Sequence, residues 1–390
     1  MPRSILFLNR VYPPAEGATG YLLSDLATAL AKAGWQVTVV TTRATADSPR
    51  SETRNGVRIE RINGLPFTRA SHWRRALSYL SLYPALISRA RRLPPTDIVV
   101  TMTDPPMHLI FGPFLKRKKN TRLIHWAQDI YPELAEQLGV LKPNRLIARG
   151  LRRLSTASLR RCDHIIVLGR CMKTRLLQRG LPAEKIRVIP NWSLATTPSD
   201  GQSFRTAHSL EGRFIVMYSG NLGLAHPFQA MINAAKIVSE SHPQIIFLFI
   251  GDGPKLTQVK QAATGLNSIR FLPSQSLEKL ADTLAAADLH LASMREDLCG
   301  LVVPSKVSGI LAAGRPCIFL GPAESESAQL LCEKQCGLVL PSHDGPALAA
   351  VLTRLITHPQ ELATLRQNAE TLAPSLGLPP ALQAFQRLFN

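Results

Sequence analysis

The sequence predicts an α/β protein built from two Rossmann-like domains, each a doubly wound parallel sheet. Short apolar runs of strand length alternate along the chain with amphipathic runs of helix length, an order typical of parallel sheets. This alternation stops once, at residues 196–212, where large apolar side chains are few. The length of 390 residues also exceeds the about 250–300 residues that one core usually reaches. We therefore expect a first domain over 1–195, a linker over 196–212 and a second domain over 213–374.

The first domain begins with a strand, a helix and a second strand. Residues 4–9 form an apolar strand, and a loop with Gly17 and Gly20 leads into a helix over 21–33. The strand–helix–strand order requires parallel pairing with the next strand, over 37–42. Further strands are expected over 97–102, 122–127, 165–168 and 186–189.

The second domain repeats this pattern. Its predicted strands cover residues 214–218, 245–250, 270–272, 289–292, 316–320 and 337–340. Its predicted helices cover residues 227–239, 305–313, 345–357 and 360–371. The amphipathic tail at 375–390 is expected to pack back on the first domain. Two domains of this kind leave a cleft between them, which is the natural place for a large ligand pocket.

Composition narrows the class of protein. Six cysteines occur without a CxxC pair or a Cys/His spacing suited to zinc, so we expect reduced thiols in a cytoplasmic protein. The apolar run at the N-terminus is too short for a secretion signal, and no stretch approaches about 18 consecutive apolar residues. We therefore expect a globular chain that is not secreted by this route and does not span a membrane.

The net charge of +19 lies entirely in the first 200 residues, and the remainder is neutral. Two basic amphipathic segments, 71–92 and 144–161, carry much of it. Their apolar faces are expected to be Trp73, Leu77, Leu80 and Ile87 in the first, and Ile147, Leu151, Leu154 and Ala157 in the second. Such segments pack on their own core with solvated basic faces, dock on anionic lipid, or bind nucleic acid. No aromatic-rich sheet face, zinc finger or recognition helix supports nucleic acid.

Polar residues follow several of the predicted strands in the first domain. In open α/β sheets, ligands bind past the carboxyl ends of the strands. Asp104, Asp129, Asn191 and the Gly17–Gly20 loop all fall at such ends. An Asp alone at such a place is more often a helix N-cap or a turn former, but several polar residues at one edge indicate a site. The loop EGATG lacks GxGxxG, so the usual NAD fingerprint is absent.

In the second domain, Pro304, Ser305 and Lys306 stand where a helix is expected to begin, with Ser305 as a candidate N-cap. Free N–H groups at a helix start attract an anion, and a Lys in the first turn is tolerated best when an anion lies opposite. The anion is most simply a phosphate. The alternative is a solvated Lys at the start of an ordinary helix.

Six motifs, in this order along the chain, resemble family 4 glycosyltransferases of the GT-B fold. YSGNLG (218–223), FIGDGP (249–254) and GLVVPSKVSGILAAGRP (300–316) resemble the donor-binding half of that family. WAQDIYPE (126–133), IIVLGRCMKTRLL (165–177) and KIRVIPNW (185–192) resemble the branch that makes cell-surface polysaccharides, including colanic-acid and O-antigen-type transferases.

The resemblance implies a retaining hexosyltransferase that takes a nucleotide-diphosphate sugar, requires no metal or other cofactor, and glycosylates a lipid-linked glycan. Asp129 would be the catalytic polar residue, and the loop with Gly17 and Gly20 would close over the reaction centre on the acceptor side. The implied donor-binding residues are Gly220, Asn221, Gly251, Pro304, Ser305, Lys306 and Glu326.

The sequence departs from the family at two places. Gly309 stands where the family has the second Glu of a Glu-x7-Glu pair, whose first position is Leu301, so the contact to the donor ribose would come from Glu324 or Glu326. The Arg that is common after the first strand of the donor half is also missing, with Leu224 nearby. Diphosphate binding would then depend more heavily on Lys306 and on backbone N–H groups.

We expect an enzyme bound peripherally at the inner face of the cell membrane, through its basic first half. One alternative is a nucleotide-sugar 2-epimerase of the same fold, which the basic first half and the Asp-x-Tyr-Pro-Glu stretch argue against. The other is a non-catalytic basic protein that binds anions or nucleic acid, which the neutral second half argues against.

Overall fold

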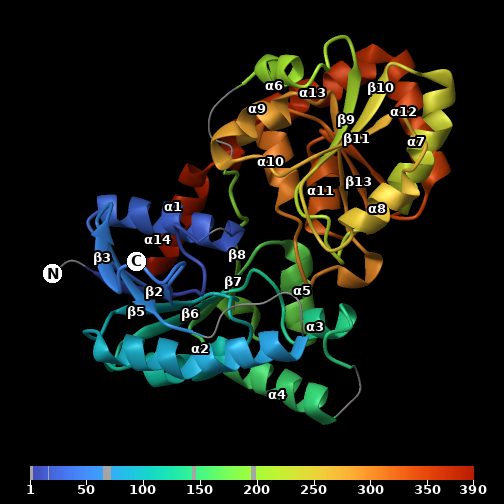
Figure 1. Cartoon of the computed structure of the whole chain (residues 1–390). Coiled ribbons are helices and arrows are strands. Elements are labelled where there is room, and N and C mark those ends of the chain that lie inside the picture. Colours follow the sequence, from blue (N-terminus) through green and yellow to red (C-terminus); the bar gives the residue numbers. More distant parts are fainter. Residues whose placement is uncertain (1–2, 16, 65–71, 143–145, 195–198) are drawn as a thin grey trace. The chain divides into compact units, whose positions relative to one another are not determined.

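The computed structural model describes residues 3–15, 17–64, 72–142, 146–194 and 199–390 (Figure 1). The chain divides into two compact units. Unit 1 comprises Met1–Pro190, Gly300–Val302 and Ala381–Asn390, and unit 2 comprises Asn191–Cys299 and Val303–Pro380. Each unit is an α/β domain around one mainly or wholly parallel sheet, which confirms the predicted fold class.

In the described part of unit 1, eight strands form one sheet in the order β3-β4-β2-β1-β5-β6-β7-β8. All neighbours pair in parallel except β3 and β4. The strands are β1 (Ser4–Leu8), β2 (Gln36–Thr42), β3 (Ser51–Arg54), β4 (Val57–Ile62), β5 (Ile98–Thr101), β6 (Arg122–Trp126), β7 (His164–Val167) and β8 (Ile186–Val188). The sequence analysis did not predict β3 and β4. All four side chains of β3 are polar, so hydrophobic patterning cannot reveal that strand.

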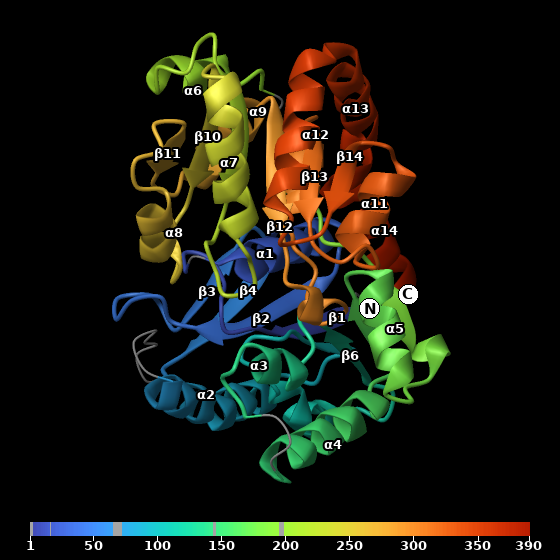
Figure 2. The ribbon, with the colours of Figure 1, turned by 90° about the vertical axis from the view of Figure 1, so that its right-hand side faces the viewer.

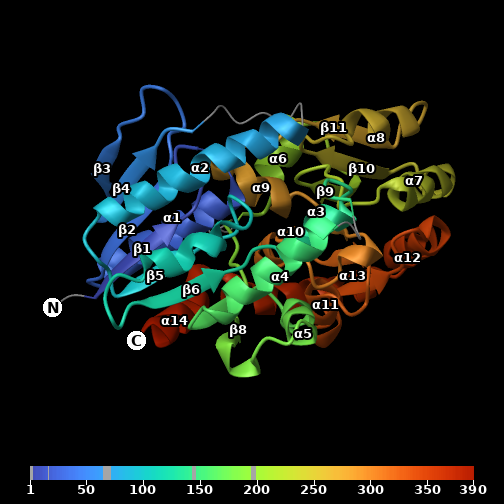
Figure 3. The same ribbon diagram turned by 90° about the horizontal axis from the view of Figure 1, so that it is seen from below.

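Helices cover both faces of this sheet. They are α1 (Ala18–Lys32), α2 (His72–Arg92), α3 (Glu133–Gln137), α4 (Leu146–Arg160) and α5 (Arg170–Gln178), with the 3-10 helices η1 (His108–Leu115) and η2 (Ala183–Lys185). Figures 1 and 3 show α2 and α4 on one side of the sheet and α1 on the other. The C-terminal helix α14 (Leu378–Phe389) lies with α1, where Phe385 packs edge-on against Trp126 of β6 at 4.9 Å between ring centres.

Unit 2 contains a parallel sheet of six strands among its described residues, in the order β11-β10-β9-β12-β13-β14. The strands are β9 (Phe214–Ser219), β10 (Ile245–Ile250), β11 (Ile269–Leu272), β12 (Leu289–Ser293), β13 (Cys317–Leu320) and β14 (Gly337–Leu340). The helices are α6 (Gln202–Ala207), α7 (Gln229–Ser241), α8 (Leu256–Ala262), α9 (Leu280–Ala285), α10 (Lys306–Ala312), α11 (Glu326–Glu333), α12 (Gly345–Thr357) and α13 (Pro359–Leu372), with η3 (Leu277–Lys279), η4 (Glu296–Leu298) and η5 (Ala373–Leu376). Helices α7 and α12 lie side by side on one face (Figure 2).

The strand orders identify the edge of each sheet at which a ligand is expected. Chain order reverses between β1 and β5 in unit 1, and between β9 and β12 in unit 2. Ligands of doubly wound sheets bind at such switch points, past the carboxyl ends of the strands. The loops after β1, β5, β9 and β12 are therefore the first places to look for a site.

The predicted linker at 196–212 is not a plain connection. Residues 202–207 form α6, and Phe204 and Leu210 are buried in a core cluster of unit 2 with Ile215 and Met217. These two apolar residues stand alone in a polar stretch, so composition hides their role. Residues 195–198 lie outside the described part of the chain.

Candidate active site

In unit 2, the loops after β9 and β10 meet through their backbones. Gly220 and Gly251 both have positive φ, at 123° and 136°. A Cβ atom added to Gly251 would lie 2.2 Å from the carbonyl oxygen of Gly220, so only glycine fits there. The N–H of Gly220 donates to the Ile250 carbonyl at 2.9 Å, and the N–H of Leu222 donates to the Asp252 carbonyl at 2.8 Å. The structure therefore brings together two predicted residues, Gly220 and Gly251, where the two loops touch, and we call this place the glycine turn.

Lys306 reaches this turn from the first position of α10. Its Nζ lies 3.8 Å from the centre of the Tyr218 ring and donates a hydrogen bond to the Tyr218 hydroxyl. The Tyr218 hydroxyl in turn donates to the Asn221 carbonyl at 3.0 Å. A Cβ atom on Gly220 would lie 3.7 Å from Nζ of Lys306. Gly220, Asn221 and Lys306, which are up to 86 residues apart in sequence, thus form one cluster.

Ser305 is the N-cap residue of α10, as predicted, but its side chain does not cap the helix. Ser305 already has helical dihedral angles (φ −66°, ψ −20°), and its hydroxyl makes no capping hydrogen bond. A capping hydroxyl needs the extended backbone that an N-cap residue normally has. Ser305 is exposed, and Pro304 before it is buried. The role of these two residues in donor binding stays a prediction.

Lys306 has no anionic partner among the described side chains. Burial lowers the pKa of Lys306 to about 7, because charge is costly away from water. Within the described part of the chain, no carboxylate forms an ion pair with it. His226 lies near Tyr218, and burial together with the charge of Lys306 lowers its pKa to about 3, so it is neutral and supplies no negative charge. This cluster is therefore suited to accepting an anion from solution.

Glu326 begins α11, which follows β13 at the same edge of the sheet. The Ser325 hydroxyl caps this helix by accepting the N–H of Ala328 at 3.3 Å. A role for Glu326 in holding a ribose stays a prediction.

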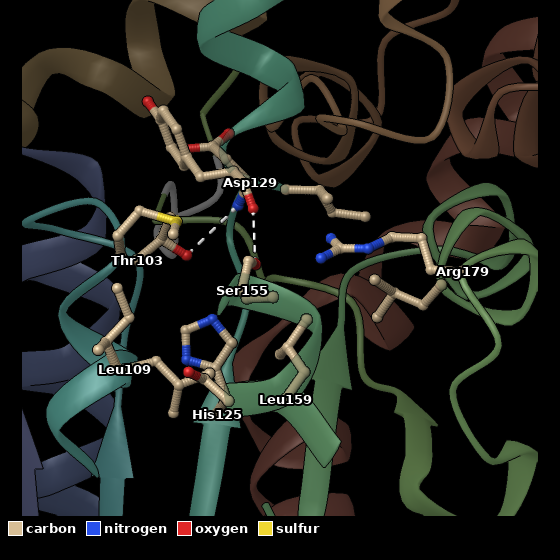
Figure 4. Close-up of a pocket in the computed structure, with 14 residues that line it drawn as sticks. Thr103, Leu109, His125, Asp129, Ser155, Leu159 and Arg179 are labelled. Atoms are coloured by element: carbon tan, nitrogen blue, oxygen red, sulfur yellow. Dashed lines mark hydrogen bonds between the residues drawn. The ribbon is translucent and has the colours of Figure 1, made fainter. Parts of the chain in front are cut away.

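In unit 1, Asp129 stands just after β6, where the sequence analysis placed it. Its backbone forms an antiparallel bridge with Val302, and the N–H of Ile130 donates to the Leu301 carbonyl at 2.8 Å. The Thr103 hydroxyl accepts the N–H of Gln128 at 2.8 Å. It also accepts the N–H of Asp129 at 3.4 Å (Figure 4). The backbone at Asp129 is thus fixed from two sides.

Asp129 lines a small pocket together with His125, Ser155 and Arg179 (Figure 4). Its free space of about 30 Å³ has room for roughly one or two water molecules. Burial raises the pKa of Asp129 to about 7, and the negative charge of Asp104 adds to the effect. Asp104 is held by Arg10, whose Nε and Nη2 donate to its two carboxylate oxygens at 2.8 Å each. Asp129 therefore changes protonation near neutral pH, as acid–base groups of enzymes often do.

Family models match both units. The model of the Glycosyl transferase 4-like domain matches residues 17–192, and that of the Glycosyl transferases group 1 matches residues 213–358. The chain belongs to the glycosyltransferases. The described residues of this glycosyltransferase include no helix both long enough and apolar enough to cross a membrane.

Three known proteins illustrate the similarity. Glycosyltransferase WbjE of Pseudomonas aeruginosa is 27% identical over 276 residues, which cover 69% of this chain and 68% of WbjE. The colanic acid biosynthesis glycosyl transferase WcaI of Escherichia coli K12 is 27% identical over 224 residues, covering 55% of this chain and 54% of WcaI. The structure of Anabaena Alr3699/HepE in complex with UDP-glucose superposes with a TM-score of 0.72 at 18% identity, over 99% of this chain and 98% of that chain. The last of these shows the two-domain GT-B fold of the glycosyltransferase.

The predicted loop with Gly17 and Gly20 differs in the structure of the glycosyltransferase. Helix α1 begins at Ala18, so Gly20 lies in its first turn. A Cβ atom on Gly17 or on Gly20 would lie 2.9 Å from Cγ1 of Val11. The two glycines therefore allow α1 to pack closely on the segment after β1, and their contact with a ligand stays a prediction.

The sequence analysis missed Arg10, Thr103 and Tyr218 in the glycosyltransferase. Arg10 directly follows the residue that ends the predicted first strand, so the rule that selected Asp104 and Asp129 also applied to it. No sequence signal reveals Tyr218, because its partner Lys306 is 88 residues away. Asn191 follows β8 and belongs to unit 2.

Proposed function

We propose that the protein is a retaining glycosyltransferase that uses a nucleotide-diphosphate sugar and needs no metal. Its acceptor is a lipid-linked glycan in polysaccharide synthesis, reached from the inner face of the cell membrane. The observation that carries this proposal is the half-buried Lys306, which lies beside the glycine turn of unit 2 without a carboxylate partner.

The donor half of the proposal depends on charge. A leaving nucleoside diphosphate develops negative charge in the transition state, and preorganised cations and N–H groups stabilise it. Lys306 supplies such a cation beside Gly220, and we infer that it takes the place of a metal ion. The HepE structure holds UDP-glucose on the same fold, which supports a sugar nucleotide as the ligand.

The acceptor half depends on Asp129. In a retaining transfer by same-face attack, the acceptor hydroxyl approaches the sugar from the side that the diphosphate leaves, and the diphosphate takes the proton. We assign Asp129 to orient that hydroxyl as a hydrogen-bond acceptor, which its carboxylate does when ionised. Thr103 and the Leu301–Val302 segment fix the backbone that carries it.

Polysaccharide synthesis on a lipid carrier is supported by two observations. The name of WcaI links that relative to colanic acid biosynthesis. The excess positive charge of +19 lies in the first 200 residues, which is the half assigned to the acceptor. Anionic membrane lipids attract such a basic surface, by about 1 kcal/mol for each Lys or Arg close to the membrane.

The experiment is a thermal-shift screen against uridine, guanosine and thymidine diphosphate sugars, because a ligand that binds only the folded state raises the unfolding temperature. We expect one base to stabilise the protein, also in the presence of EDTA. Transfer by the stabilising donor to membrane extracts, with the anomeric configuration read by NMR, then tests the reaction. If no sugar nucleotide raises the unfolding temperature, the proposal is refuted. If the protein converts the donor into its epimer when no acceptor is present, it is an epimerase instead.

A further inference from the structure

Helix α4 of unit 1 buries small and polar side chains and exposes large apolar ones. Its buried residues are Ala148, Ser155, Ser158 and Leu159. Leu146, Ile147 and Leu154 instead have exposed fractions of 79%, 66% and 43%. Ile147 and Leu154 of the predicted apolar stripe therefore face outward, so packing on the protein's own core, one of the alternatives left open above, does not apply to these two side chains.

Polar contacts hold α4 in this orientation. The Ser155 hydroxyl donates to the Tyr131 carbonyl at 2.9 Å. On one flank, Arg152 pairs with the buried Glu136 of α3 at 3.5 Å, and Nη2 of Arg179 donates to the Thr156 hydroxyl at 2.8 Å. Rotation of α4 to bury its leucines would break these contacts. The apolar residues therefore face outward in the folded protein.

Neighbouring elements extend the apolar surface. Helix α4 packs against η1, and η1 packs against α2, on the same side of the sheet (Figures 1 and 3). Phe114 of η1 and Leu80 of α2 are each 60% exposed. Leu80 was predicted on the apolar face of its helix, but the side of the helix that is buried carries Leu82, Leu86 and Ala90. The side chains of Trp73 and Leu77, and residue Arg145, lie outside the described part.

We use the name outer face for the exposed apolar side chains of these three elements, which are Leu80, Phe114, Leu146, Ile147 and Leu154. Its charge has one sign. Helices α2, α4 and η1 contain no Asp or Glu. Arg149 and Arg153 of α4 and Arg91 of α2 are exposed. An exposed apolar group with a cationic surround is typical of a helix that lies in the headgroup region of a membrane.

We propose that the outer face inserts its apolar side chains into the surface of an anionic lipid bilayer, with α4 as the main inserting element. Insertion goes beyond electrostatic attraction of a basic surface, because it requires particular leucine and isoleucine side chains. A second copy of the chain fits less well, because a two-fold contact would bring the same cationic faces together.

This docking would place the acceptor site near the lipid. Ser155, Ser158 and Leu159, on the inner side of α4, line the pocket that contains Asp129 (Figure 4). A helix is about 10 Å across, so an inserted α4 holds that pocket within roughly 10–15 Å of the bilayer surface. This consequence rests on the proposed function, whereas the docking itself does not.

The test is flotation with vesicles of phosphatidylglycerol and phosphatidylethanolamine, compared with vesicles of phosphatidylcholine. The full chain should bind the anionic vesicles. The double variant Ile147→Glu/Leu154→Glu should bind them at least about tenfold more weakly. The matched control is Ile237→Glu on α7 of unit 2, which is 47% exposed and should leave binding unchanged. All variants should unfold at the wild-type temperature, because the altered side chains are exposed.

Two further measurements keep the proposal open to refutation. In a Leu154→Trp variant, brominated lipid should quench the new indole, which adsorption by charge alone would not do. Unchanged vesicle binding by the double variant would overturn the proposal. So would a wild-type dimer that the double variant dissociates, because the second copy would then cover this face. Donor-induced thermal shifts in the same variants show separately whether the proposed sugar transfer fails.

Discussion

Nζ of Lys306 lies 3.8 Å from the centre of the Tyr218 ring, on the π face rather than beside a carboxylate. A ring face stabilises a cation only partly, by about 0.5–2 kcal/mol. The amine is therefore held in place but left short of negative charge, and burial lowers its pKa to about 7. A bound diphosphate would complete this arrangement, and the predictions for unit 2 follow from it.

Replacing Lys306 with Ala should weaken binding of the sugar nucleotide by about 1.5–3 kcal/mol, the usual contribution of a charge-assisted hydrogen bond. Titration calorimetry measures the loss. The control is Lys260→Ala, because Lys260 also lies over a ring, 5.7 Å from the centre of Phe271, but on α8 away from the glycine turn. Equal affinity of the wild type and Lys306→Ala would remove Lys306 from the donor site.

Donor binding should take up a proton above pH 7. In the free protein the pKa of Lys306 is lowered to about 7, and a bound diphosphate should raise it back toward 10.5. Between these values the free amine is neutral and the bound amine is charged, so affinity should be constant below pH 7 and fall as pH rises above it. Calorimetry in two buffers of different ionisation enthalpy detects the proton. The Lys306→Ala variant should show no such uptake.

Changing Asp129 to Asn should reduce turnover strongly and leave donor affinity nearly unchanged, because Asp129 belongs to the acceptor side. Steady-state kinetics with donor and acceptor varied separately measures both effects. Wild-type turnover should rise as pH increases through 7, where the Asp129 carboxyl ionises. Full activity of Asp129→Asn would exclude Asp129 from the reaction.

Asp129 should also make stability depend on pH. Its pKa is 3.8 in the ordinary case and is raised to about 7 in the folded protein, so the folded state binds more protons between these values. The wild type should therefore lose stability relative to Asp129→Asn as pH rises from about 4 to about 7. Urea unfolding across this range provides the measurement. In Asp104→Asn the loss should be smaller and should end at lower pH, because the pKa of Asp129 in the folded protein is raised less once the negative neighbour is gone.

Replacing each of two glycines of unit 2 with Ala should change the stability of that unit in opposite directions. Gly251→Ala should destabilise unit 2 by at least about 2 kcal/mol, because φ is 136° and the new Cβ meets the Gly220 carbonyl at 2.2 Å. Gly309→Ala should stabilise it by about 0.5–1 kcal/mol, because Gly309 is inside α10 and its nearest neighbour would be Cδ1 of Leu284 at 3.7 Å. Thermal unfolding distinguishes the two, and a stable Gly251→Ala protein would contradict the described turn.

The structure also shows whether the backbone at position 309 would admit a side chain, such as the Glu that the family has there. Space beside Gly309 admits a Cβ atom, so the backbone does not force glycine there. Leu301, at the other position of the pair, is fully buried, and its carbonyl holds Ile130. Burial thus accounts for the apolar residue at Leu301, whereas nothing in the structure explains the glycine at 309.

The sequence by itself determined the two parallel sheets, the order of most strands along the chain, and the polar residues at their carboxyl ends. Periodicity and glycine positions are local properties, so they can be read without coordinates. Strand β3 and helix α6 were not predicted, because a polar strand and isolated apolar residues produce no periodic hydrophobic pattern.

Only the tertiary structure decided which side chains meet and which apolar residues stay outside. Tyr218 and Lys306 are 88 residues apart, and no local pattern specifies their contact. The apolar stripe of α4 was visible in the sequence, but its orientation was not. That orientation depends on long-range contacts such as the hydrogen bond between Ser155 and Tyr131. Amphipathic periodicity predicts which residues share one side of a helix, but it does not predict whether that side faces the core or the solvent.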